Sequence, residues 1–247
     1  MSFDKNVTEF YDKGFTIVEN IIPENWLDEI GEEILRLERW RHESNIKDGD
    51  PKDFGNGYWW KGFDMATHVS PTLKKYYESE FTYNLASAFL KTDELYFFND
   101  EIVTKFPFEQ CKFMMHTDCE YGPIPEAAEK GEYRMVVLYW MLDDHTPDNG
   151  PIRFQDIKQP KPTEENIWLD HGDEPPGEGW EWTLPKRGDM VVFDGNTLHY
   201  SVSNNSGKLR RAWANHFTTM PIGHLPYQNK KHPLESWKWF YSHRFTL

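Results

Sequence analysis

The strongest constraint on the fold is a series of short runs rich in β-branched and aromatic residues between residues 94 and 217. Residues typical of turns separate these runs. Many short strands with turn signals between them predict a β-sandwich or a β-barrel. The runs expected to form strands cover residues 95–98, 102–106, 112–117, 134–142, 152–154, 180–184, 190–193, 198–202 and 209–217.

The first third of the chain has patterns typical of helices instead. Residues 8–12 look like the end of a short helix closed by Gly14, and residues 15–18 are a strand candidate. Pro23 suits the first turn of a helix, and a helix is expected over residues 24–40 because apolar positions there recur at helical spacing. Those positions are Leu27, Ile30, Ile34 and Leu37. The pattern predicts an amphipathic helix that packs on another layer.

Other segments outside the β-rich region are expected to form helices or loops. A proline opens a second helical region at residues 71–89, and residues 234–240 are expected to form a closing helix. Two segments, residues 41–57 and 158–179, are rich in loop-forming residues. Loops of this length are uncommon in a compact domain and are frequently lids or binding loops. An insertion without a role is an equally open interpretation.

Composition limits the classes of function. A chain of 247 residues suits one domain with a single core. Its net charge of -14 disfavours binding to nucleic acid and gives no reason to expect attraction to an anionic membrane. The two cysteines, Cys111 and Cys119, provide neither a disulfide framework nor a zinc cluster. Without a signal-peptide pattern or an apolar stretch of spanning length, a cytoplasmic protein is expected, with a monomer as the default.

A motif at the end of one predicted strand carries the clearest chemistry. His116 and Asp118 lie two residues apart, so an extended chain points both side chains to the same face. One imidazole and one carboxylate are two-thirds of a facial two-histidine, one-carboxylate site, which leaves positions on iron for a 2-oxo acid and O2. His199, which follows a buried strand and a turn, is the best candidate for the third ligand.

The motif alone is weak evidence, because a lone histidine is more often a surface or hydrogen-bonded residue than a ligand. A second copy at residues 171–173 lies among prolines and glycines, and we expect it at the surface. The first copy ends an apolar strand, which a buried site needs.

A 2-oxo acid also needs a cation for its distal carboxylate, and arginine supplies a bidentate one. Arg210 and Arg211 lie just past the candidate third ligand, after a turn predicted at residues 204–207. If that turn closes a hairpin, Ser201 falls opposite Arg210 and shares the face of His199. The alternative is that the two arginines are solvated charges on an edge strand.

Together these residues resemble the phytanoyl-CoA dioxygenase family of iron(II)/2-oxoglutarate oxygenases, over nearly the whole chain. The segments that carry the resemblance are residues 10–20, 24–40, 105–107 before the His-X-Asp motif, 140–151, 188–199, and then Ser201, Asn205, Ser206 and Arg210. Three departures stand out. Residues 152–156 replace a Pro-Gly-Ser-His run, Thr117 stands where the family often has Gln, and the chain is shorter than many relatives.

The resemblance implies one domain over residues 1–247, mainly β with flanking helices. Its core would be a double-stranded β-helix, a cupin-like jelly roll, over residues 94–219, with a mainly helical flank at 1–93 and a closing segment at 220–247. The family's chemistry implies Fe(II) and 2-oxoglutarate as cofactor and co-substrate. It also implies O2 and a small-molecule substrate, with hydroxylation of that substrate and release of succinate and CO2.

The resemblance also assigns roles to single residues. It implies iron ligands at His116, Asp118 and His199. Residues expected to hold 2-oxoglutarate are Arg210 and Ser201, with Lys105 and Tyr139 as further candidates and Arg211 as the fallback if the register differs by one. Halogenase relatives lack the carboxylate ligand, so the presence of an aspartate favours hydroxylation, or desaturation or ring closure.

Two other classes of function stay open from the sequence. One is a catalytically silent jelly-roll binding module, and the other is a cupin-like metalloenzyme, such as an isomerase, that does not use 2-oxoglutarate. The coexistence of all three candidate ligands with Arg210 argues against the binding module, whereas the other metalloenzyme would not need Arg210 or Ser201. The substrate itself is not readable. Trp59 and Trp60 could form an aromatic wall for a cationic amine, although ordinary core and loop packing is the favoured explanation.

Overall fold

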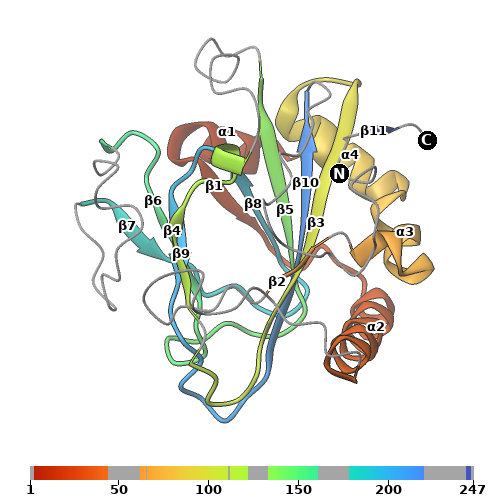
Figure 1. The fold of residues 1–247 in the computed structure, drawn as a ribbon. Coiled ribbons are helices and arrows are strands. Elements are labelled where there is room, and N and C mark those ends of the chain that lie inside the picture. Colours follow the sequence, from red (N-terminus) through yellow and green to blue (C-terminus); the bar gives the residue numbers. More distant parts are fainter. Residues whose placement is uncertain are drawn as a thin grey trace.

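Two antiparallel β-sheets face each other in the computed structural model (Figure 1). The model describes residues 3–43, 62–64, 66–110, 112–121, 133–160, 178–219 and 243–245. The large sheet has the strand order β1-β8-β5-β10-β3-β11, with β2 also paired to β3, and the small sheet has the order β4-β9-β6-β7. This is the predicted jelly-roll core, a double-stranded β-helix with flanking helices.

The strands of the large sheet are β1 (Phe15–Val18), β2 (Gly62–Asp64), β3 (Leu95–Lys105), β5 (Met135–Met141), β8 (Met190–Asp194), β10 (Arg210–Thr218) and β11 (His243–Phe245). Those of the small sheet are β4 (Phe113–His116), β6 (Ile152–Gln155), β7 (Trp180–Trp182) and β9 (His199–Ser201). The helices are α1 (Asp4–Lys13), α2 (Glu24–Glu43), α3 (Pro71–Tyr77) and α4 (Glu80–Leu90), with 3-10 turns η2 (Ala66–His68) and η3 (Asp118–Tyr121).

The large sheet is buried on both faces, and β5 shows how. Every residue of β5 is buried. Leu138 and Trp140 belong to the apolar cluster that includes the helices, whereas Val137 and Tyr139 belong to the cluster between the two sheets. This alternation follows the period of two of a strand. Helices α2, α3 and α4 lie on the side of the large sheet away from the small sheet (Figure 1). The inner face is therefore left to line a space between the sheets.

Within the described residues, the helical predictions are confirmed with one correction. Helix α1 ends at Gly14, and α2 begins at residue 24 as expected. The region predicted as one helix at residues 71–89 is two helices, α3 and α4. Ser70 and Ser79 cap them, because each hydroxyl accepts a backbone N–H of the first turn, at 3.1 and 3.3 Å. A serine at this position favours the start of a new helix.

The strand predictions are likewise confirmed except that residues 95–98 and 102–106 form one continuous strand, β3. The polar residues between them suggest a turn, but Asp100 is fully buried. Its carboxylate accepts the backbone N–H and the hydroxyl of Thr67 and the indole N–H of Trp213. A buried carboxylate with several donors can stay within a strand.

Several predictions fall outside the described residues: the closing helix at 234–240, the His-X-Asp copy at 171–173, Trp59 and Trp60, and most of the two long loops. In the part of the chain that the structure describes, no helix combines the length and the apolar character that a bilayer span requires.

Gly14 is expected to be intolerant of substitution. Its φ is +89°, and an added Cβ would lie 2.4 Å from the Thr197 hydroxyl and 2.9 Å from Ile157 Cβ. Gly14→Ala should lower the free energy of unfolding by roughly 2–4 kcal/mol, measured by urea denaturation. In the control Gly207→Ala, the added methyl would meet Phe108 at an ordinary 3.5 Å. The control should stay within about 0.5 kcal/mol of the wild type, and equal losses in both variants would contradict this explanation.

Candidate metal centre

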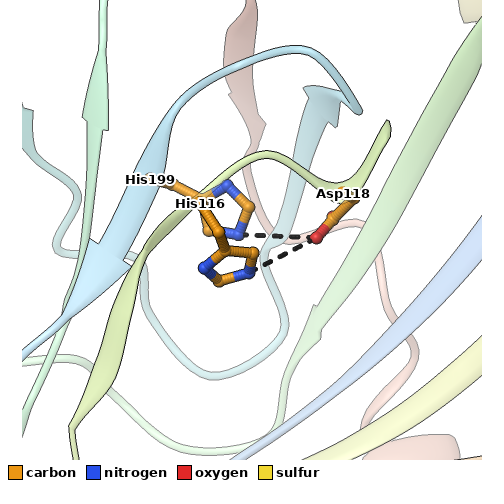
Figure 2. Close-up of side chains that lie close together, drawn as sticks. All are labelled: His116, Asp118 and His199. Atoms are coloured by element: carbon orange, nitrogen blue, oxygen red, sulfur yellow. Dashed lines mark ion pairs between the residues drawn. The ribbon is translucent and has the colours of Figure 1, made fainter. Parts of the chain in front are cut away.

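Two histidines and one aspartate meet where the small sheet faces the large one. His116 on β4 and His199 on β9 are paired across the small sheet, with ring centroids 4.3 Å apart. The Nε2 atoms of His116 and His199 lie 3.5 and 3.8 Å from Oδ1 of Asp118 (Figure 2). One potential ligand atom from each residue lies within 4.8 Å of the others. The structure thus brings together the three residues that the sequence predicts as ligands.

Backbone carbonyls fix the orientation of both imidazoles. His116 Nδ1 lies 2.6 Å from the carbonyl oxygen of Met114, and His199 Nδ1 lies 3.0 Å from that of Thr197. If each Nδ1 donates to its carbonyl, each Nε2 carries a lone pair directed at the space beside Asp118. Such carbonyl partners are the usual way in which proteins orient metal-binding histidines.

The spacing of the motif predicts an extended chain from His116 to Asp118, and this part of the prediction is wrong. Strand β4 ends at His116, and Asp118 begins the short helix η3. Its carboxylate still turns toward the histidines. Burial opposes ionisation of Asp118, but His199, His116 and His216 hold its pKa well below the ordinary value. Burial, and then His116, lower the pKa of His199 to about 4. A carboxylate and a neutral imidazole are the forms that bind a metal ion.

A pocket opens beside this cluster, and the empty space in it, open solvent included, is about 420 Å³. Its lining comes from both sheets: Glu101, Val103, Phe113, His116, Asp118, Tyr139, Ile152, Phe193, His199, Tyr200, Ser201, Ala214 and His216. The candidate ligands therefore face a pocket that opens to solvent.

Two buried cations lie behind the hydroxyl groups of this pocket. Lys105 is 0% exposed and donates from Nζ to the Ser201 hydroxyl at 2.7 Å. Arg210 is 1% exposed and donates from Nη1 to the Tyr139 hydroxyl at 3.0 Å and from Nη2 to the Gly150 carbonyl at 2.7 Å. Among the described residues no carboxylate pairs with Arg210, and its Nε has no hydrogen-bond partner. A buried guanidinium without an anion is costly, so this end of the pocket suits a negatively charged group.

The predicted hairpin that places Ser201 opposite Arg210 is wrong. β9 belongs to the small sheet and β10 to the large one, so the chain crosses between sheets at residues 202–209. Ser201 pairs with Phe113 and Ile152, and Arg210 pairs with Lys105. Turn-forming residues indicate where the chain bends but not whether the next strand joins the same sheet. The two side chains nevertheless approach the same pocket from opposite sheets.

Arg211, the fallback clamp, points away from the pocket. Its guanidinium donates to both oxygens of Asp143, each at 2.8 Å, and to the Gly31 carbonyl on α2 at 3.1 Å. Alternation along β10 explains the difference, because neighbouring side chains face opposite sides of the sheet. Arg211 has its own carboxylate partner, and Arg210 has none among the described residues.

Two pocket-lining residues and one buried histidine were not predicted from the sequence. Glu101 and His216 line the pocket from β3 and β10. His145 is 1% exposed, and neither ring nitrogen has a hydrogen-bond partner among the described residues. Burial, with Arg210 and Lys105, lowers the pKa of His145 well below the ordinary value, so it is neutral. Isolated residues of this kind carry no local motif. The alternation of side chains along β3 and β10, which directs every second residue toward the pocket, is the one signal that could have identified Glu101 and His216.

Comparison with known proteins gives a family match and a shared fold. The family model described as phytanoyl-CoA dioxygenase (PhyH) matches residues 10–212. A search of curated proteins found no match. Among solved structures, the chain resembles SnoN, the non-heme alpha ketoglutarate dependent epimerase from nogalamycin biosynthesis. The TM-score is 0.68 at 15% identity, over 93% of this chain and 91% of SnoN.

Two further structures are similar over most of the chain. EctD from S. alaskensis, solved with 2-oxoglutarate and 5-hydroxyectoine, has a TM-score of 0.66 at 18% identity, over 88% of this chain and 76% of EctD. EvdO2 from Micromonospora carbonacea var. aurantiaca has a TM-score of 0.63 at 19% identity, over 94% of this chain and 96% of EvdO2. At such low identity these similarities concern the fold.

Proposed function

Because this chain belongs to the phytanoyl-CoA dioxygenase family, we propose that it is an iron(II)- and 2-oxoglutarate-dependent oxygenase that hydroxylates a small molecule. One observation carries the proposal. A single pocket combines a His-Asp-His cluster on one side with two hydroxyl groups, each backed by a buried cation, on another. A bidentate metal chelator with a distal carboxylate fits both features.

The donor set fits iron(II). His116, Asp118 and His199 would hold the ion, since two neutral imidazoles and one carboxylate are the ligands of the facial triad. Their ligand atoms already lie within 4.8 Å of one another, and backbone carbonyls orient both rings. When bound, iron(II) would activate O2, which is the oxidant, and 2-oxoglutarate would supply two of the four electrons that O2 accepts as it is oxidised to succinate and CO2.

The polar end of the pocket fits the distal carboxylate of 2-oxoglutarate. Tyr139 and Ser201 each accept a hydrogen bond from a cation, so each hydroxyl can turn its own hydrogen toward the pocket. Burial raises the pKa of Tyr139 despite the opposing effect of Arg210, so the phenol remains a donor. Lys105 and Arg210 supply the positive charge behind these donors. Charge-assisted hydrogen bonds of this kind are the strong ones.

The reaction class is the finer part of the proposal. SnoN is described as an epimerase, so the shared fold does not by itself select hydroxylation. The carboxylate of Asp118 supports hydroxylation over halogenation, because halogenase relatives lack this ligand and bind a halide in its place. The pocket opens to solvent beside the candidate ligands, which supports a small molecule that enters from solution as the substrate.

Anaerobic spectroscopy tests the proposal directly. Metal-free protein receives Fe(II) and then 2-oxoglutarate, and a weak visible charge-transfer band is expected only when both are present. Succinate in place of 2-oxoglutarate is the control, since it lacks the 2-oxo group that chelates the metal. A folded wild-type protein that gives no band would sink the oxygenase proposal and favour a binding module or another metalloenzyme.

A further inference from the structure

His216 approaches the candidate metal centre from the opposite sheet. It lies on β10 of the large sheet, whereas His116 and His199 lie on the small sheet. Its Nε2 is 3.3 Å from Oδ2 of Asp118, the carboxylate oxygen that the other two histidines do not face. Their Nε2 atoms lie 3.5 and 3.8 Å from Oδ1. Each oxygen of the carboxylate is therefore directed toward a different sheet.

The backbone around His216 is shaped to hold this ring. The register between β10 and β3 shifts after His216, which pairs with Asn99, while the next residue pairs with Phe97. Such a bulge redirects a side chain and is common beside functional sites. It brings the Asn99 carbonyl oxygen to 3.3 Å from His216 Nδ1 and the Phe98 ring edge-on against the imidazole, with centroids 6.4 Å apart. His216 is 6% exposed.

We infer that His216 is a positioning residue that holds Oδ2 of Asp118, so that the carboxylate binds the metal through Oδ1 alone. The inference rests on the proposed function. Carboxylates bind metals with one oxygen or with two, and nothing in the sequence of a His-X-Asp motif decides between them. Here His216 decides it. The anionic Oδ2 of Asp118 is a stronger acceptor than the Asn99 carbonyl, which lies at the same 3.3 Å from Nδ1, so the favoured tautomer carries its proton on Nε2 and donates it to Oδ2.

The number of open positions on the metal gives this contact its importance. A facial triad leaves positions that a bidentate 2-oxo acid and O2 can fill. If Asp118 chelated with both oxygens, it would take one of these positions. By occupying Oδ2, His216 keeps that position open. Residues that hold a metal ligand in this way typically contribute about 10–100-fold to metal affinity or activity.

Two amide substitutions distinguish the contact that Nε2 of His216 makes from the contact that its Nδ1 makes. The Nε2 of glutamine reaches about as far as histidine Nε2, and the Nδ2 of asparagine about as far as histidine Nδ1. His216→Gln therefore keeps a donor for Asp118, and His216→Asn keeps only the contact with the Asn99 carbonyl. Phe98→Leu controls for packing around the ring. Each protein is titrated with Co(II) without 2-oxoglutarate, and affinity and visible absorption, which reports coordination number, are measured.

The expected result is a Co(II) affinity about 10–100-fold weaker in His216→Asn, with a changed spectrum. His216→Gln and Phe98→Leu should remain within a few-fold of the wild type. Wild-type affinity and spectrum in both amide variants would overturn the inference, and so would equal losses in both, since the role would then belong to the ring as a whole. A wild-type protein that binds neither Co(II) nor Fe(II) would defeat the proposed function instead.

Discussion

Replacing Asp118 with alanine is expected to abolish turnover of 2-oxoglutarate and to weaken Fe(II) binding by at least about 100-fold. The lower bound follows because loss of a mere supporting contact to a ligand already costs about 10–100-fold. Asp118 is also the residue that joins the two sheets at the site, facing two histidines through Oδ1 and His216 through Oδ2. Its removal leaves two imidazoles without the negative charge that helps retain a divalent cation.

The measurement combines anaerobic Fe(II) titration with detection of succinate. Cys119→Ala is the matched control, because it truncates the neighbouring side chain on the same short helix η3 and leaves the triad intact. Circular dichroism establishes that both variants are folded. Succinate production by the Asp118→Ala variant at the wild-type rate would refute a role for this residue as a metal ligand.

The candidate metal ligands could be predicted from the sequence better than the residues and strand pairings around them. His116 and Asp118 are close in the chain, and His199 follows a recognisable buried strand, so local spacing made them candidates that the family resemblance then supported. The structure brings all three together. His216 could not be selected in this way, because its role depends on a bulge and on a contact between opposite sheets. No local sequence pattern predicts the pairing register between strands that are distant in the chain.

The errors in the fold have the same physical origin. Asp100 and its polar neighbours look like a turn, yet partners distant in sequence bury and satisfy that carboxylate within β3. The chain bends at residues 206–208, close to the turn predicted at 204–207, but the strand after it belongs to the other sheet, since turn residues encode a bend and not the sheet that follows. Helix α2 and strand β1 were predicted well because amphipathic period and turn signals are local properties.

Replacing Arg210 with alanine is expected to weaken 2-oxoglutarate binding by about 10–100-fold, while the protein still binds Fe(II). The magnitude is that of a lost hydrogen bond to a charged group, about 1.5–3 kcal/mol. Arg210 supports the Tyr139 hydroxyl and the Gly150 carbonyl, and it has no carboxylate partner among the described residues. The variant removes the charge that would attract the distal carboxylate and leaves the metal ligands in place.

Arg211→Ala is the matched control, because the two arginines are neighbours on β10 that face opposite sides of the large sheet. Arg211 is bound to Asp143 and to the Gly31 carbonyl, so its loss should lower stability without changing the affinity for 2-oxoglutarate. Both affinities are measured by the anaerobic charge-transfer titration at saturating Fe(II). Weaker binding in Arg211→Ala alone would transfer the clamp to Arg211. Unchanged affinity in both variants would mean that neither arginine holds the co-substrate, and would leave Lys105 as the remaining buried cation behind the pocket.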